Sequence, residues 1–308
     1  MSHIPPKEVL SQVAAAVPAA CRENIVVIGS LAAGYHFFGE DPTKAVRTKD
    51  VDCLLAPFKA AVGAGQSIAR QLLDAGWKRR MEGDHQQPGD PSTPVDKLPA
   101  VRLFPPDVNP DSEDAWFIEL LTVPESPEDH GRKWTRLPLE EGHFGLPTFR
   151  FISITAYDAI PVGDLGIRYA RPEMMALANL LEHPEIKSDR MSGLFEGRSI
   201  KRSNKDLGRV LAIATLADLD DYRPWATSCM QALQTCFPDE WQSLALRVGD
   251  GLRALLESPS DLEEAHHTCL NGLLASQPPS LDALRAAGER VLGEAVEKLE
   301  ESVDNTKS

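Results

Sequence analysis

The stretch that decides the fold is residues 25–55, which read IVVIGSLAAGYHFFGEDPTKAVRTKDVDCLL. The run Ile25–Ile28 is short, apolar and β-branched, and glycine ends it, so the pattern predicts a buried strand. Residues 31–38 are apolar and favour a short helix packed under a sheet. A polar loop follows, and residues 50–55 then predict a second strand that turns apolar after two carboxylates.

Those two carboxylates are Asp50 and Asp52. On a strand, residues two apart point to the same face, with their Cα atoms about 7 Å apart. Acidic side chains on a strand that leads into a core are costly unless something neutralises them. Hard oxygen ligands of this kind suit magnesium, so the pair indicates a divalent-cation site.

The order of these features resembles the active-site signature of the nucleotidyltransferase (polymerase-β-like) superfamily. The shared pattern is Gly29-Ser30 closing a strand, then a helix, then an Asp-x-Asp strand. The tract Arg47–Asp52 resembles most closely the AbiEii-type branch, whose best-known members are toxins of toxin–antitoxin systems. The resemblance extends over roughly residues 22–216.

The resemblance implies a third metal carboxylate on a later strand. Residues 116–123, WFIELLTV, predict that strand, and Glu119 lies within it. By resemblance Asp50, Asp52 and Glu119 hold Mg²⁺ or Mn²⁺, and all three belong to the catalytic site. The cofactor is then the metal ion, and a nucleoside triphosphate (NTP) is the substrate.

The resemblance also implies a set of phosphate-binding groups. A helix opening at Pro172 matches the family helix that carries a phosphate-binding lysine, but here the lysine position holds Ala178 or Asn179. Lys187 or Lys201 could take its place. The tract Lys205-Asp206-Leu207 matches a second family segment at the start of a helix. This adds Asp206 to the catalytic residues, and the expected nucleotide-binding residues are Gly29, Ser30, Arg47, Lys49, Lys201 and Lys205.

Bulk composition limits the possible partners. The 308 residues are 42% hydrophobic and carry a net charge of −14, which argues against a protein that coats nucleic acid. Residues 187–209 nevertheless hold seven basic against three acidic residues. No apolar run is long enough to span a bilayer and no secretory signal is visible, so we expect no membrane partner and a cytoplasmic location. The five scattered cysteines fit reduced thiols.

Together these patterns predict an α+β chain. Residues 1–165 are expected to form a nucleotidyltransferase-like catalytic domain, with a mixed β-sheet and flanking helices, and residues 166–308 a helical C-terminal bundle. Residues 149–154 are expected to be a strand, residues 130–144 to lie among turns, and residues 241–256 to form one helix.

Two classes of function follow. The first is a metal-dependent nucleotidyltransferase that moves an NMP from an NTP onto an acceptor hydroxyl. By resemblance the acceptor is the 3′ end of a tRNA, which would make the chain a toxin with an antitoxin partner; a protein hydroxyl is the competing acceptor. The second class is a degenerate scaffold that binds nucleotide or a partner, which the missing lysine at 178–179 favours. A transferase acting on a small molecule is a third option.

Overall fold

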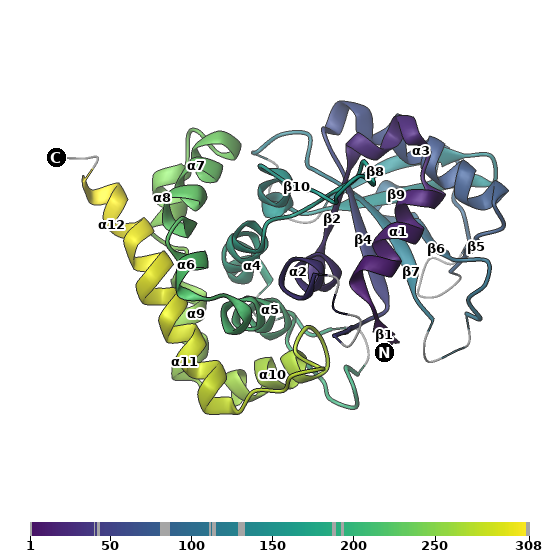
Figure 1. The fold of residues 1–308 in the computed structure, drawn as a ribbon. Coiled ribbons are helices and arrows are strands. Elements are labelled where there is room, and N and C mark those ends of the chain that lie inside the picture. The colour runs from purple at the N-terminus through teal and green to yellow at the C-terminus, as the bar shows by residue number, and fades with distance from the viewer. Residues whose placement is uncertain are drawn as a thin grey trace.

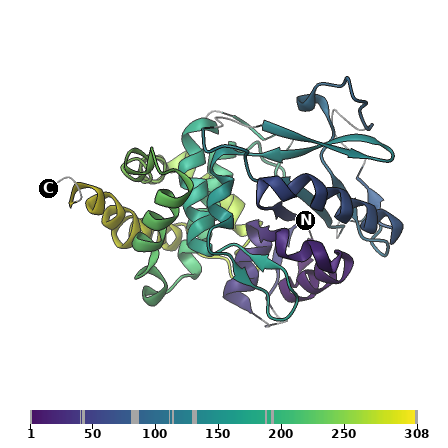
Figure 2. The same cartoon turned by 90° about the horizontal axis from the view of Figure 1, so that it is seen from above.

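The structure is a computed structural model that describes residues 2–39, 41, 44–80, 87–110, 112, 115–128, 133–186, 189–191 and 194–305. It places a β-sheet with flanking helices beside a group of helices formed by the C-terminal half (Figure 1). Helices α4 (Pro172–Ile186) and α5 (Arg202–Leu216) lie between the two parts. Seen from above, the C-terminal helices lie on one side and the N-terminal half of the chain on the other (Figure 2).

The main sheet has seven strands in the described residues, in the order β10-β11-β2-β4-β7-β6-β5. Two further pairs lie outside it, β1 with β3 and β8 with β9. The strand bounds are β1 Ser2–Ile4, β2 Ile25–Ile28, β3 Val46–Thr48, β4 Asp50–Leu55, β5 Lys78–Arg79, β6 Arg102–Phe104, β7 Phe117–Thr122, β8 Lys133–Leu139, β9 Gly142–Thr148, β10 Ile160–Pro161 and β11 Arg168–Tyr169.

Three helices belong to the sheet part and the others to the C-terminal part. The first three are α1 Pro6–Ala16, α2 Gly29–Phe38 and α3 Phe58–Asp74. After α5 come α6 Leu219–Tyr222, α7 Trp225–Cys236, α8 Trp241–Ala245, α9 Asp250–Glu257, α10 Pro259–Leu270, α11 Leu281–Val291 and α12 Glu297–Asn305, with a π-helical turn at Leu292–Val296. Short 3₁₀ segments occupy Ala19–Asn24, Val95–Lys97 and Arg150–Ala156.

The centre of the sheet is set by the pairing of β2, β4 and β7. Strand β2 runs antiparallel to β4, and β4 runs parallel to β7. Helix α3 covers the face that carries Leu55, whose side chain lies against Gly65 of that helix. Since side chains alternate along a strand, Asp52 points to the opposite face, toward α4 and α5.

The mixed α+β architecture with flanking helices and C-terminal helices is as predicted. Buried apolar residues of both parts form one continuous cluster, in which Val27 of β2, Leu177 of α4 and Leu211 of α5 all take part. The last strands of the sheet, β10 and β11, fall on both sides of residue 165. The division into domains 1–165 and 166–308 stays a prediction.

Three local predictions were wrong. Residues 149–154 fall in a 3₁₀ segment, where the Thr155 hydroxyl donates to the carbonyl of Ile152 (2.6 Å); a short apolar run does not distinguish a strand from a buried helical turn. Of residues 130–144, predicted to lie among turns, 130–132 are outside the described residues and the rest belong to the hairpin of β8 and β9, which turns before Gly142 at φ +132°. Residues 241–256 form two helices, α8 and α9, separated by a turn at residues 246–249.

Candidate active site

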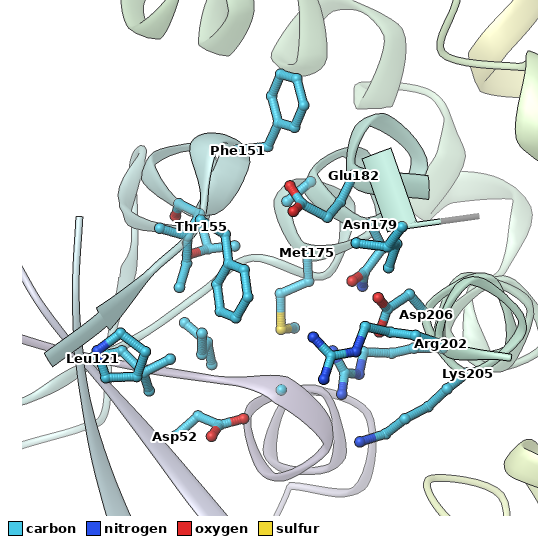
Figure 3. A pocket seen from close by; sticks show the side chains of 18 of the residues that line it. Asp52, Leu121, Phe151, Thr155, Met175, Asn179, Glu182, Arg202, Lys205 and Asp206 are labelled. Atoms are coloured by element: carbon cyan, nitrogen blue, oxygen red, sulfur yellow. Dashed lines mark hydrogen bonds between the residues drawn. The ribbon is translucent and has the colours of Figure 1, made fainter. Parts of the chain in front are cut away.

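A cavity of about 270 Å³ opens between the carboxylate face of the sheet and helices α4 and α5 (Figure 3). Its residues come from both parts of the chain. The sheet contributes Ile28, Asp52, Arg102, Glu119 and Leu121, and the segment after β9 contributes Phe149, Phe151, Ile152 and Thr155. Helix α4 contributes Met175, Ala178, Asn179, Glu182 and Ile186, and α5 contributes Arg202, Lys205, Asp206 and Arg209.

Strand register places three charged residues in one row. Asp52 of β4 pairs with Glu119 of β7, which in turn pairs with Arg102 of β6. Cross-strand partners share a face of the sheet, so all three side chains reach the same cavity. The Arg102 guanidinium donates to Glu119 Oε1 at 3.1 Å, and the Glu119 side chain is only 10% exposed.

Asp50 is held as an anion. Burial alone would raise its pKa, but nearby Lys205, a hydrogen bond from the Thr48 hydroxyl (2.5 Å to Oδ1) and Arg209 together lower the pKa below the ordinary aspartate value. Asp50 lines a second cavity of about 70 Å³ rather than the first. Asp52, Lys205 and Arg209 line both cavities and therefore lie where the two spaces meet.

Asp52 has the opposite electrostatic setting. Burial, and then repulsion from Asp50 and Glu119, raise its pKa well above the ordinary aspartate value. Its carboxylate also lies against the start of α2, because a Cβ atom on Gly29 would fall 2.9 Å from Asp52 Oδ2. Gly29 has φ +79°, a conformation that side chains disfavour, so only glycine fits this junction without strain.

Helix α5 supplies the positive wall. Arg202, Lys205 and Arg209 are spaced i, i+3 and i+7, which places them on one helix face, with Asp206 beside them. Figure 3 shows Arg202 and Lys205 extending toward Asp52. Burial raises the pKa of Asp206, although the neighbouring Arg209, Lys205 and Arg202 partly offset that shift.

The cavity also has apolar lining residues, among them Phe149 and Met175. Asn179 and Glu182 of α4 line it as well (Figure 3). The position where the resemblance expects a lysine therefore does face the cavity, but as Ala178 and Asn179. The basic residues that line the cavity come from α5 (Arg202, Lys205 and Arg209) and from β6 (Arg102).

The remaining predicted residues fall at different places. Ser30 and Arg47 line the second cavity, and Arg47 donates to Asn271 (2.8 Å) and contacts Glu196 (3.4 Å). Lys49 is exposed and lines neither cavity. Lys201 also lies outside both, with its ammonium 2.6 Å from Asp261. Lys187 is outside the described residues.

Some site residues were not predicted from sequence. Arg102 sits opposite Glu119 only through strand pairing, which leaves no local signal. The i, i+3, i+7 spacing of Arg202, Lys205 and Arg209 was a readable signal, since it predicts one basic helix face. Thr48, two residues before Asp50, could have been found as its hydrogen-bond donor.

The donor set accommodates a divalent cation in part. Asp50 and Asp52 are hard oxygen donors on one strand face. Burial, and then repulsion from Asp50 and Glu119, raise the pKa of Asp52, and a bound cation would offset both effects. Glu119 is instead engaged by Arg102. In keeping with that, the described parts of the chain contain no group of three or more Asp, Glu, His or Cys side chains that could hold a metal ion.

Comparisons with known proteins add little to this geometry. No family model matches the sequence, and no curated protein matches it. Among solved structures, an antigenic nucleotidyltransferase-like protein from Paracoccidioides brasiliensis is similar over 78% of this chain and 92% of its own, with 15% sequence identity and a TM-score of 0.32. A likeness at that level carries no argument about function, so the function has to be argued from the site.

Proposed function

We propose that the chain is a metal-dependent nucleotidyltransferase, which moves an NMP from an NTP onto an acceptor hydroxyl. The observation that supports this most directly is that carboxylates and basic side chains face each other across one cavity. Asp50 and Asp52 stand on the sheet, and Lys205 and Arg209 stand opposite on α5. An anionic substrate bridged to carboxylates by a cation would fit between such walls.

The reaction needs positioning and charge neutralisation more than covalent chemistry. The acceptor oxygen bonds to the α-phosphorus of the NTP, the bond from that phosphorus to the bridging oxygen breaks, and pyrophosphate leaves. Asp50 and Asp52 would hold Mg²⁺ or Mn²⁺, with Glu119 as a third ligand by resemblance; the ion, when bound, neutralises charge on the phosphates. Lys205 and Arg209 donate to phosphate oxygens from the other side.

The two cavities suggest how the nucleotide is oriented. The apolar residues that line the larger one, such as Phe149 and Met175, would contact the flat base, and Asn179 would hydrogen-bond the base edge. The phosphates would then reach the junction at Asp52, Lys205 and Arg209. Gly29 lets the backbone approach this junction closely, and Ser30 lines the smaller cavity beyond it.

Asp206 is the proposed general base. It lines the larger cavity beside Lys205. Burial raises the pKa of its carboxyl, which brings it closer to the range in which a base accepts a proton efficiently at neutral pH. Its task would be to take the proton of the acceptor hydroxyl as the phosphorus–oxygen bond forms.

The acceptor we propose first is the 3′ end of a tRNA. A net charge of −14 disfavours a long RNA footprint, whereas an end-binding mode needs only a few phosphate contacts. In that case the chain would act as the growth-inhibiting toxin of a toxin–antitoxin pair in the cytoplasm. A protein hydroxyl is the second acceptor class.

A labelling assay tests the proposal. The protein is incubated with each α-labelled NTP, Mg²⁺ or Mn²⁺, and either total tRNA or cell extract. Label should appear in RNA or protein with the native chain and be absent with Asp50→Ala/Asp52→Ala. A double variant that transfers label as well as the native chain does would refute the mechanism.

The alternative is a scaffold that binds nucleotide without transferring it. Two observations favour it: no lysine stands at 178–179, and Glu119 is already paired with Arg102. The alternative predicts nucleotide binding that is unchanged by added Mg²⁺ and by the Asp50→Ala/Asp52→Ala change. The transferase predicts that metal and nucleotide strengthen each other's binding.

A further inference from the structure

We propose that Arg102 takes the place of a second metal ion, so that the site binds one divalent cation through Asp50 and Asp52 while Glu119 stays paired with the guanidinium. This inference rests on the proposed function and specifies its metal chemistry. It departs from the expectation that Glu119 is a metal ligand.

The pairing of Arg102 with Glu119 is built into the sheet. Antiparallel register between β6 and β7 sets the two residues directly opposite each other, and their side chains meet at 3.1 Å. Both line the larger cavity, and with Asp52 they complete a row of three. The register keeps the two residues opposite each other as long as the strands stay paired.

Arg102 is also placed to act on more than Glu119. Its positive charge is felt by Asp50 and Asp52 as well as by Glu119, and its side chain is 33% exposed. Its Nε is buried, so any donor available to a ligand lies on the two terminal nitrogens, of which Nη2 already donates to Glu119. Each terminal nitrogen carries two N–H groups, so donors remain for a phosphate or acceptor oxygen.

A fixed guanidinium changes what the third carboxylate can do. A divalent cation bound at Glu119 would sit beside a positive charge that cannot be deprotonated, and it would have to displace a bond already made. Asp52, the other carboxylate of the row, lies opposite Glu119 rather than opposite a cation, and Asp50, outside the row, accepts its hydrogen bond from the neutral Thr48 hydroxyl. The charge of a second ion is therefore supplied by the chain itself, and Arg102 would neutralise the substrate from the sheet side as Lys205 does from α5.

Mn²⁺ binding followed by electron paramagnetic resonance tests this without any turnover. The native chain should bind one Mn²⁺. Glu119→Gln should bind one as well, with an affinity within about threefold of native, because a lost ligand or ligand partner typically costs about 10- to 100-fold. Arg102→Met should release Glu119 and either add a second ion or tighten binding about tenfold.

A matched control is Arg80→Met. Arg80 packs over the ring of Phe117, 4.2 Å from its centre, and Arg102 lies 5.9 Å from the same ring, but only Arg102 lines the larger cavity. This control should bind Mn²⁺ as the native chain does. Circular dichroism establishes that each variant is folded, and Arg102→Gln, which also removes the charge, serves if Arg102→Met does not fold.

The outcomes separate this inference from the proposed function. Two ions on the native chain, a tenfold loss in Glu119→Gln, or Mn²⁺ binding that Arg102→Met leaves unchanged would each overturn the role of Arg102 and leave the transferase standing. No Mn²⁺ bound by the native chain at millimolar concentration would overturn both.

Discussion

Removing either of two adjacent carboxylates should change stability in opposite directions. At pH 8 without metal, Asp52→Asn should stabilise the chain and Asp50→Asn should destabilise it. Burial, and then repulsion from Asp50 and Glu119, disfavour the charged form of Asp52 and raise its pKa. Asp50 is instead stabilised as an anion by Lys205, Thr48 and Arg209 against the cost of burial.

The magnitudes follow from simple electrostatics. Two unit charges about 7 Å apart repel by about 2 kcal/mol at an effective dielectric constant near 20. Attraction of Asp52 to Lys205 and Arg209 cancels part of this, so Asp52→Asn should gain about 1 kcal/mol, or about 2 °C in Tm. Asp50→Asn relieves the same repulsion, but it loses the attraction to Lys205 and Arg209 and a charged hydrogen bond from Thr48, so we expect a net cost of about 1 kcal/mol.

The pH dependence gives a second test of the sign. The folded-state pKa of Asp52 is raised, so this group destabilises the fold increasingly as pH rises above its unfolded value, and the gain from Asp52→Asn should vanish at pH 4. The folded-state pKa of Asp50 is lowered, so its contribution is present above the unfolded pKa and is lost as pH falls through the folded value.

Scanning calorimetry at pH 4 and pH 8, with and without 10 mM Mg²⁺, measures all of these effects. Mg²⁺ should raise the Tm of the native chain, because a ligand that binds only the folded state stabilises it. It should leave the Tm of Asp52→Asn nearly unchanged. Equal shifts in one direction for Asp50→Asn and Asp52→Asn at pH 8 would refute the assignment of charge states.

Three further predictions concern single positions. Gly29→Ala should destabilise the chain by about 1–3 kcal/mol and lower label transfer, because φ is +79° and the new methyl meets Asp52; an unchanged Tm would contradict this. Lys205→Met should weaken NTP binding at least tenfold in fluorescence titrations, whereas Lys201→Met, which breaks only the pair with Asp261, should leave it within about twofold. Asp206→Asn should remove the rise of kcat with pH that a base of raised pKa produces, and a variant that keeps this rise would exclude Asp206 as the base.

The carboxylate face was predictable because it depends on a period of two. Asp50 and Asp52 share a face in any strand, and Glu119 shares one with Phe117 and Leu121, so only the pairing of the two strands was missing. The structure supplies it as the parallel register Asp52↔Glu119. Arg102 and Glu119 are 17 residues apart in the sequence, and no local pattern predicts the strand register that sets them opposite each other.

The errors have a common physical origin. The run at 149–154 is apolar and short, so burial is readable from it but backbone conformation is not. Its Arg150 is buried against Glu240 of the C-terminal part, 2.5 Å away, a contact that lies 90 residues along the chain. The hairpin β8–β9 was missed because its turn depends on Gly142 at positive φ within a region rich in charged residues.

The sheet and α5 carry opposite charges at the site, so the net charge of −14 is a poor guide to what this site binds. The sheet presents Asp50, Asp52 and Glu119, and α5 presents Arg202, Lys205 and Arg209 with Asp206 beside them, so acidic and basic groups face each other across the site. An NTP alone would meet the carboxylates, and a cation alone would meet α5. Each ligand therefore improves the site for the other, and by thermodynamic linkage the gain must be equal in both directions. That reciprocity would be expected of an active transfer centre, whereas a scaffold that had lost its metal would bind nucleotide with no such coupling.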